Sequence, residues 1–367
     1  MLEFLRSYHF IYNVLIVVLS ALVTLLCIPS ILHVARARHL YDDVGHFRKQ
    51  HDHGIPRLGG VAIFVSFTIT ALLFGIIDKS LPISYVLTAC IILFAMGLKD
   101  DLSGVNSSTK FLIQFIVAAI LVIPGDIRIS SMYGIFGIET LPYIPSVILS
   151  VLGIMLIVNS FNLIDGIDGL AATTGIVANS AFAALFIYLK QYELAAISLA
   201  MVGAIAGFLR YNITPAKIFM GDTGALLIGL ISAVMAIKFM ELSKVSGGKL
   251  PFDFTAPSLT IAILIGPVFD TLRVFTLRIL DGRSPFDADR NHIHHRILKL
   301  GLTHLQTTLV LAGMNIVSIA MVLLLTSLSN SLLIVLILLL SLFFNWMITF
   351  FIRSKERESL SLRNLFA

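Results

Sequence analysis

The most informative residues end a long apolar run. Residues 159–170 read Asn-Ser-Phe-Asn-Leu-Ile-Asp-Gly-Ile-Asp-Gly-Leu, which places Asn159, Asn162, Asp165 and Asp168 three residues apart. At that spacing the side chains would share one face of a helix. Inside hydrocarbon each would cost several kcal/mol unless it met a cation, a ligand or water. The segment is therefore predicted to serve function rather than packing.

Three further polar clusters accompany this segment along the chain. They are Asp100-Asp101, the turn Phe219-Met220-Gly221-Asp222-Thr223-Gly224, and the run His292-Ile293-His294-His295-Arg296. Carboxylates and amides without a cysteine among them favour a hard cation such as Mg²⁺, with Mn²⁺ as a substitute, because such ions take oxygen ligands and are usually shared with phosphates. The histidines, Arg296 and Lys110 would donate to anionic oxygens. Because phosphoryl transfer works by positioning and charge neutralisation around a diphosphate, the combined pattern is typical of a phosphoryl-transfer site.

The composition indicates the solvent in which this site must be built. The chain is 57% hydrophobic and 13% charged, whereas soluble domains carry about a quarter charged residues. Apolar stretches close to the ~20 residues that cross a bilayer predict eleven spans. They cover residues 11–32, 58–77, 83–98, 108–123, 143–163, 170–189, 193–209, 224–240, 258–279, 306–326 and 331–352. The expected fold is an all-α transmembrane helix bundle, with residues 1–367 forming one integral-membrane domain.

The distribution of Lys and Arg predicts how the bundle lies in the membrane. Loops at 33–57, 99–110, 210–223, 273–304 and 353–367 hold 19 of the 26 basic residues. Basic loops face the cytoplasm, so we expect the N-terminus outside and the C-terminus inside. All four polar clusters then fall on the cytoplasmic side. The net charge of +5 is explained by this topology and an anionic leaflet rather than by nucleic-acid binding.

At these residues the chain resembles the polyprenyl-phosphate N-acetylhexosamine-1-phosphate transferases. The resemblance rests on the four clusters and extends upstream to Arg48-Lys49-Gln50-His51. It implies a polytopic membrane enzyme that moves a sugar 1-phosphate from a UDP-N-acetylhexosamine to a polyprenyl phosphate and releases UMP. The implied partners are these two substrates and membrane lipids, and pairing into a homodimer stays open.

Two stretches separate the branches of that family. Relatives that use UDP-N-acetylmuramoyl-pentapeptide carry a Lys before Gly-Thr-Pro-Thr-Met-Gly-Gly, and three consecutive His before Phe-Glu. Here the corresponding stretches read Asp52-His53-Gly54-Ile55-Pro56-Arg57-Leu58-Gly59-Gly60 and His292-Ile293-His294-His295-Arg296. The chain is thus similar to the simple-sugar branch, which uses undecaprenyl phosphate to start cell-wall or lipopolysaccharide O-antigen chains. The implied donor is UDP-N-acetylglucosamine, although relatives with other N-acetylated sugars share these motifs.

The resemblance also implies roles for individual residues. It places Asp222 and Asn162 on Mg²⁺, Phe219 against the uracil face and Asp168 at the uracil edge. These roles agree with the chemistry, since an aromatic plane can stack on a base and a carboxylate can accept the imide N–H. Lys110 is expected to neutralise the lipid phosphate.

The remaining candidates surround the reacting phosphates. Asp100 and Asp101 are expected to deprotonate or position the attacking lipid phosphate, and which of them does so is open. The loop His292-x-His294-His295-Arg296 is expected to hold the sugar diphosphate. Asp165 completes the catalytic candidates and Asn159 the substrate-binding ones. Direct attack by the lipid phosphate and a covalent aspartyl route both remain open.

Each cluster also has a simpler interpretation when taken alone. Asp100-Asp101 is compatible with a solvated turn, Asn159 with a polar contact between helices, and the histidine run with a zinc site. For the whole chain the alternative is an ion- or proton-coupled transporter, because carboxylates inside spans also mark ion pathways. Transporters place such groups near the midplane, whereas these lie at span ends. A CDP-alcohol phosphotransferase would need Asp-Gly-x-x-Ala-Arg, and the Arg is absent after Asp168-Gly169.

Overall fold

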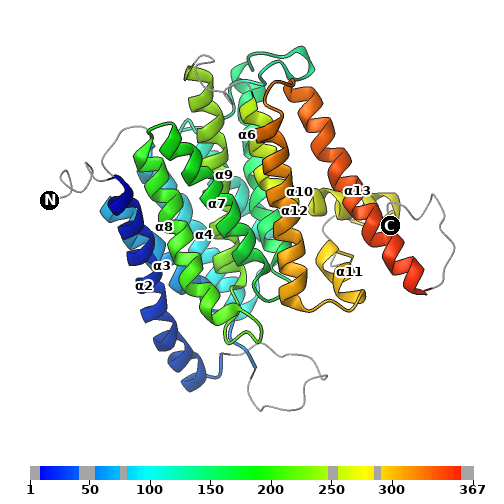
Figure 1. Ribbon diagram of the computed structural model, residues 1–367. Helices are drawn as coiled ribbons and strands as arrows, with labels where there is room; N and C mark the ends of the chain where they lie inside the picture. Colours follow the sequence, from blue (N-terminus) through cyan, green and yellow to red (C-terminus); the bar gives the residue numbers. More distant parts are fainter. Residues whose placement is uncertain (1–8, 41–53, 75–80, 247–254, 285–290, 357–367) are drawn as a thin grey trace.

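The computed structural model describes residues 9–40, 54–74, 81–246, 255–284 and 291–356. In this part of the chain the fold is all-α, and strand pairing is limited to one isolated bridge between Ser131 and Thr140 (Figure 1). Long helices stand at all eleven predicted spans: α2 (His9–Ala37), α3 (Gly59–Phe74), α4 (Ile83–Ser103), α5 (Ser107–Val122), α6 (Tyr143–Ile164), α7 (Leu170–Tyr188), α8 (Tyr192–Asn212), α9 (Gly221–Ser246), α10 (Ala256–Leu280), α12 (His304–Leu324) and α13 (Asn330–Glu356). Two short helices, η1 (Ile135–Gly137) and α11 (Ile293–Lys299), complete the described elements.

The lengths and compositions of these helices confirm the predicted polytopic membrane bundle. Nine of the described helices are long and apolar enough to cross a membrane, and α3 and α5 are shorter apolar helices. Helix α9 is mostly buried and forms the centre, with α3, α4, α6 and α7 packed against it. Helices α2 and α8 cover one side, and α10, α12 and α13 stand on the other (Figure 1). The predicted site residue Asp222 thus begins the central helix.

The two ends of the described chain lie on opposite faces of the bundle. Tyr12, near the start of α2, donates to the carbonyl oxygen of Phe74 at 3.0 Å, at the end of α3 far from the site. Lys355, in the last turn of α13, donates to the carbonyl oxygens of Lys299 and Leu300 at 3.2 Å each, beside the histidine run. An odd number of spans requires this arrangement. Which face is cytoplasmic stays a prediction.

A proline within α10 is matched by a polar side chain on α12. Pro267 has no N–H, so the carbonyl of Ile263 loses its usual helical partner. Asn315 donates its side-chain N–H to that carbonyl oxygen at 2.8 Å, and its oxygen accepts the Gly266 N–H at 3.1 Å. The second half of α10, which leads towards the histidine run, is therefore fixed to α12.

Candidate active site

The start of α9 is packed closely against α3 and α4 through glycines. A Cβ at Gly60 of α3 would clash with the α9 backbone, and one at Gly97 of α4 would lie 2.7 Å from the Cα of Thr223. Gly221 has a φ of 73°, a left-handed conformation that costs glycine little. Glycine at position 221 thus allows the left-handed turn before α9, and the close packing of α9 on α3 and α4 fixes the position of Asp222.

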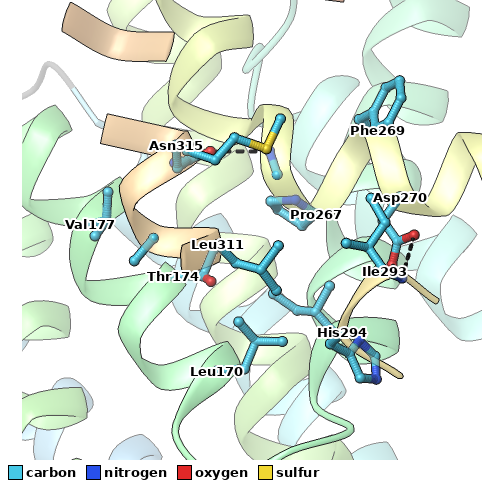
Figure 2. Close-up of a pocket in the computed structure, with 14 residues that line it drawn as sticks. Leu170, Thr174, Val177, Pro267, Phe269, Asp270, Ile293, His294, Leu311 and Asn315 are labelled. Atoms are coloured by element: carbon cyan, nitrogen blue, oxygen red, sulfur yellow. Dashed lines mark hydrogen bonds between the residues drawn. The ribbon is translucent and has the colours of Figure 1, made fainter. Parts of the chain in front are cut away.

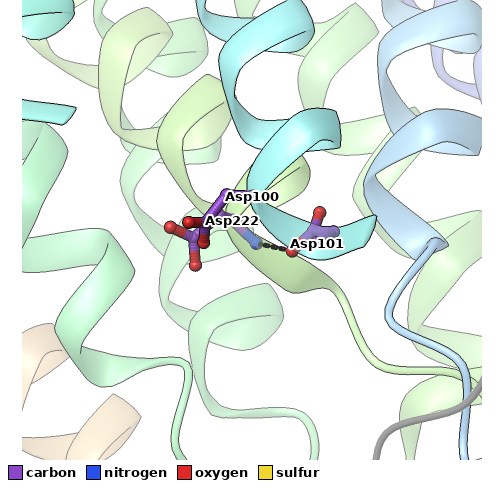
Figure 3. A group of neighbouring side chains, drawn as sticks. All are labelled: Asp100, Asp101 and Asp222. Atoms are coloured by element: carbon purple, nitrogen blue, oxygen red, sulfur yellow. Dashed lines mark hydrogen bonds between the residues drawn. The ribbon is translucent and has the colours of Figure 1, made fainter. Parts of the chain in front are cut away.

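Asp101 on α4 accepts hydrogen bonds from the first turn of α9. Its Oδ1 accepts the Asp222 N–H at 2.8 Å, and its Oδ2 accepts the N–H and hydroxyl of Thr223 at 3.0 and 2.6 Å. A carboxylate in this place satisfies free N–H groups and interacts favourably with the helix dipole. Figure 3 shows Asp101 on one side of the turn, with Asp100 beside Asp222 on the other.

Lys110 of α5 joins Asp100 to Asp222. Its Nζ lies 2.7 Å from Oδ2 of Asp100 and 2.8 Å from Oδ2 of Asp222. One oxygen from each of Asp100, Asp101 and Asp222 lies within 4.8 Å of the others. Oxygen donors at this spacing fit a hard divalent cation, and the ammonium group between two of them indicates that this position favours positive charge. Asp100 and Asp222 therefore offer oxygens of the kind that the predicted Mg²⁺ takes, whereas the oxygens of Asp101 already accept from the start of α9.

A cavity of about 460 Å³ adjoins this carboxylate cluster through Lys110. It lies between α5, α6, the end of α10 and the start of α11. Seven of the predicted site residues line it: Lys110, Asn159, Asn162, Asp165, His292, His294 and His295. The structure thus brings together Lys110, residues 159–165 and residues 292–295, which lie far apart in the sequence.

Asp165 follows the last residue of α6 at the cavity wall. Burial raises its pKa well above the ordinary value, and the charges of Asp222 and Asp101 raise it further, against the opposing effect of Arg57. Cations near a carboxylate have the opposite effect on its pKa. Asn159, six residues before Asp165 on α6, donates its side-chain N–H to Oε1 of Gln114 at 2.5 Å. Because a nearby cation would lower the pKa of Asp165, the charge on this carboxyl group depends on what the cavity holds.

The histidine run forms the start of α11. His292 Nδ1 lies 3.0 Å from Oδ2 of Asp270 on α10, and the Ile293 N–H donates to Oδ1 of the same residue at 3.0 Å (Figure 2). His294 and His295 follow within the helix, with ring centroids 4.2 Å apart. Asp270 therefore fixes the point at which the histidines meet the cavity.

His294 is enclosed between two cavities. It lines the large one and a small apolar one of about 30 Å³ between α7, α10 and α12 (Figure 2). Burial, reinforced by the charge of His295, lowers its pKa to about 3, so the ring is neutral near pH 7. Its Nε2 is buried without a hydrogen-bond partner among the described residues. A Cβ at Gly166 would clash with this ring, which explains a glycine there.

Phe219 is not among the residues that line the cavity, and its backbone bonds to the stretch before α3. Its N–H donates to the carbonyl of Pro56 at 2.9 Å, and its carbonyl accepts the Gly59 N–H at 2.9 Å. The stretch 54–60 thus pairs with the turn before α9. The upstream part of the resemblance, residues 48–53, lies outside the described residues. The predicted stacking of Phe219 on uracil stays a prediction.

Asp168 and Arg296 also lie outside the cavity lining. Asp168 accepts the Ala216 N–H at 3.3 Å and lies 3.4 Å from Nδ1 of His304. Arg296 is buried against α13, where it donates to Asn345 at 2.5 Å and to Thr349 at 2.6 Å. Burial, then repulsion by Arg273, lowers its pKa to about 10. In this structure Arg296 attaches α11 to α13 and does not face the cavity.

Sequence reasoning missed three polar residues of the site. Gln114 and the buried Arg278 line the cavity, and Asp270 holds His292. Asp270 and Arg278 are charged side chains inside an apolar span, and such residues face a partner or a functional site by default. That rule could have identified both. Gln114 carries no comparable signal.

Comparisons with known proteins agree with this geometry. The model of glycosyl transferase family 4 matches residues 83–240. A probable undecaprenyl-phosphate N-acetylglucosaminyl 1-phosphate transferase of Bacillus subtilis (strain 168) is 31% identical over 298 residues, which cover 80% of this chain and 79% of that protein. The decaprenyl-phosphate N-acetylglucosaminephosphotransferase of Mycolicibacterium smegmatis is 33% identical over 285 residues, covering 72% and 70%. The undecaprenyl-phosphate alpha-N-acetylglucosaminyl 1-phosphate transferase of Escherichia coli (strain K12) is 28% identical over 272 residues, covering 72% and 71%.

Fold and site together define a multi-pass membrane transferase. The chain belongs to glycosyl transferase family 4, among the polyprenyl-phosphate N-acetylhexosamine-1-phosphate transferases.

Proposed function

We propose that this protein transfers N-acetylglucosamine 1-phosphate from UDP-N-acetylglucosamine to undecaprenyl phosphate. One observation carries the proposal. The Asp100–Lys110–Asp222 cluster and the histidines of α11 adjoin one cavity at one end of a membrane helix bundle. Oxygen ligands on one side and imidazole and basic groups on the other suit a diphosphate held between a cation and hydrogen-bond donors. The relatives' names supply the sugar and the lipid.

The reaction forms a bond between a lipid phosphate oxygen and the phosphorus that carries the sugar, and it breaks the bond from that phosphorus to UMP. Lys110 would bind the lipid phosphate. Asp100 accepts hydrogen bonds from the Lys110 ammonium and from the Val105 N–H, and it would position or deprotonate the lipid phosphate. Asp101 is engaged with α9, so a covalent aspartyl route would have to use another carboxylate of the site, and both routes stay open. His292 and His295 would hold the sugar diphosphate.

Mg²⁺ is the proposed resident cation, with Mn²⁺ as a substitute. Asp222 and Asn162 would hold it, with Asp100 adjacent. When bound, it would neutralise the diphosphate and the charge that develops on its oxygens during transfer. Lys110 and Asp100 would orient the lipid phosphate, and His292 and His295 would orient the sugar diphosphate.

The proposed location is the bacterial cytoplasmic membrane, with the site on the cytoplasmic face. The excess of Lys and Arg in loops at the site end supports this orientation. The carboxylates Asp100 and Asp222 lie at helix ends rather than in mid-bundle. That placement favours an enzyme that meets a soluble nucleotide sugar over a transporter with a midplane site.

A substrate panel tests the proposal. Purified protein in lipid nanodiscs is given undecaprenyl phosphate and Mg²⁺ with UDP-N-acetylglucosamine, UDP-N-acetylgalactosamine or UDP-N-acetylmuramoyl-pentapeptide, and the lipid product is identified by mass. We expect an undecaprenyl diphosphate N-acetylglucosamine product and equimolar UMP. A product formed only from another donor would overturn the sugar assignment, and no lipid product from any donor would overturn the reaction.

A further inference from the structure

Asp270 is the centre of a buried hydrogen-bond network behind the cavity. The residue is 3% exposed within α10. Its Oδ1 accepts from the Ile293 N–H at 3.0 Å and from Nη2 of Arg273 at 3.1 Å, and its Oδ2 lies 3.0 Å from Nδ1 of His292. Arg273 also donates to the carbonyl of Asn291. Residues 291–293 are therefore held to α10 by one ion pair.

This network specifies which nitrogen of His292 carries hydrogen. An ionised carboxylate only accepts hydrogen bonds, so the nitrogen that bonds to Asp270 must be the donor. Nδ1 is thus protonated in either charge state of the ring. Because His292 lines the large cavity and Nδ1 is bonded behind it, Nε2 is the nitrogen that remains for a ligand.

We propose that Asp270 is a positioning residue that holds His292 with Nδ1 protonated and Nε2 presented to the diphosphate of the sugar donor. The proposal rests on the proposed function, which assigns this cavity to that diphosphate. When both ring nitrogens carry hydrogen, Nε2 offers an N–H to an anionic oxygen. Asp270 acts through His292 and does not itself touch the substrate.

The competing explanation is that Asp270 serves only to neutralise Arg273 and to start α11. Asp270→Asn keeps the shape and leaves one accepting oxygen for α11, but it also removes the charge that faces Arg273, so its effect is compared in the presence and absence of His292. The amide NH₂ cannot accept a hydrogen bond from Nδ1, so the ring loses its fixed tautomer. His292→Gln provides the partner variant, since its amide can reach the cavity without support from Asp270.

A double-mutant cycle tests the coupling. We expect Asp270→Asn to lower kcat/KM for UDP-N-acetylglucosamine by about 10- to 100-fold, the range found when orienting partners of metal-ligating histidines are removed. The KM for undecaprenyl phosphate should stay within about twofold. In the His292→Gln background the same substitution should cause little further loss, because residues that act through one another are non-additive. Losses that multiply, or an unchanged Asp270→Asn enzyme, would overturn the proposal. Asp270→Glu should recover part of the activity.

Two controls keep the result interpretable. Asp281→Asn makes the same chemical change at the exposed end of α10, where Asp281 pairs with Arg283, and should leave kcat/KM unchanged. The tautomer itself is read by ¹⁵N NMR of histidine-labelled protein, with His292→Gln identifying the signal. We expect a protonated Nδ1 in the wild type and its loss in Asp270→Asn. An Nε2-only proton in the wild type would refute the inference even if Asp270→Asn failed to fold. This readout needs no turnover, so it decides the role of Asp270 separately from the transferase reaction.

Discussion

The Asp101→Asn substitution tests whether this carboxylate serves the start of α9 or the reaction. Asp101 accepts three hydrogen bonds from Asp222 and Thr223, at 2.8, 3.0 and 2.6 Å. Asparagine has nearly the same shape but only one accepting oxygen. If that oxygen keeps the two bonds from Thr223, the amide group must face the Asp222 N–H, and two donors then oppose each other.

The expected cost follows from the bonds lost. A hydrogen bond to a charged group contributes about 1.5–3 kcal/mol, and a negative charge near a helix N-terminus contributes about 0.3–1 kcal/mol. Their loss predicts a decrease of about 2–4 kcal/mol in the free energy of unfolding. Turnover per folded molecule should change little, because Asp100 and Lys110 keep their places beside Asp222.

Thermal unfolding in detergent and kcat measured well below the unfolding temperature separate these outcomes. Asp101→Asn should lower the unfolding temperature while kcat stays within a few-fold of wild type. Thr223→Val, which removes the 2.6 Å hydroxyl bond and keeps the shape, should give a smaller shift of the same kind. A kcat reduced a hundredfold or more at an unchanged unfolding temperature would place Asp101 in the chemistry and refute the reasoning.

Four other outcomes are expected. Asp222→Asn should abolish turnover with little change in unfolding temperature, and exhaustive chelation should inactivate the wild type; full activity after chelation would remove the metal proposal. Phe219→Ala should weaken UMP binding about 5- to 150-fold, the equivalent of a ~1–3 kcal/mol stack, and leave lipid binding intact when the two are titrated separately. Burial holds the pKa of His294 at about 3 against an ordinary 6.5, so the unfolded chain binds a proton that the folded one does not. Stability should therefore fall as the pH drops from 6.5 towards 3, and His294→Gln should flatten that dependence in thermal unfolding. A cysteine introduced at Ser284 should resist an impermeant reagent outside intact cells, and labelling there would contradict a cytoplasmic site.

The spans were predictable because hydrocarbon leaves few choices to the backbone. A segment without water must satisfy its own N–H and C=O groups, so a long apolar run becomes a helix. The predicted span 143–163 accordingly matches α6 (Tyr143–Ile164), and 331–352 matches α13 (Asn330–Glu356). The gathering of the polar clusters at one end was also predictable, since alternate span ends share a face.

The facing of individual side chains was not predictable from the same signals. Asp100 and Asp101 are neighbours in sequence, yet on a helix they point about 100° apart, and hydropathy does not fix how α4 is rotated. Packing of Gly97 against Thr223 fixes that rotation, so Asp100 meets Asp222 while Asp101 bonds to the α9 backbone. The same applies to α11, where Arg296 turns to α13 although it follows two histidines of the cavity.

Asp270 is a buried charge whose partners come from two separate parts of the chain. In sequence Asp270 and Arg273 form an i, i+3 pair of opposite charge inside an apolar span. A carboxylate, however, has two oxygens and room for several donors, whereas Arg273 contributes one hydrogen bond to it. The remaining acceptor capacity must be filled, because an unsatisfied buried charge is strongly unfavourable. The chain fills it 22 residues later with His292 and Ile293. Asp270 therefore determines where the histidine run is held. Because Arg273 cannot fill all the acceptor sites of this carboxylate, its presence in an apolar span indicates a further partner elsewhere in the chain.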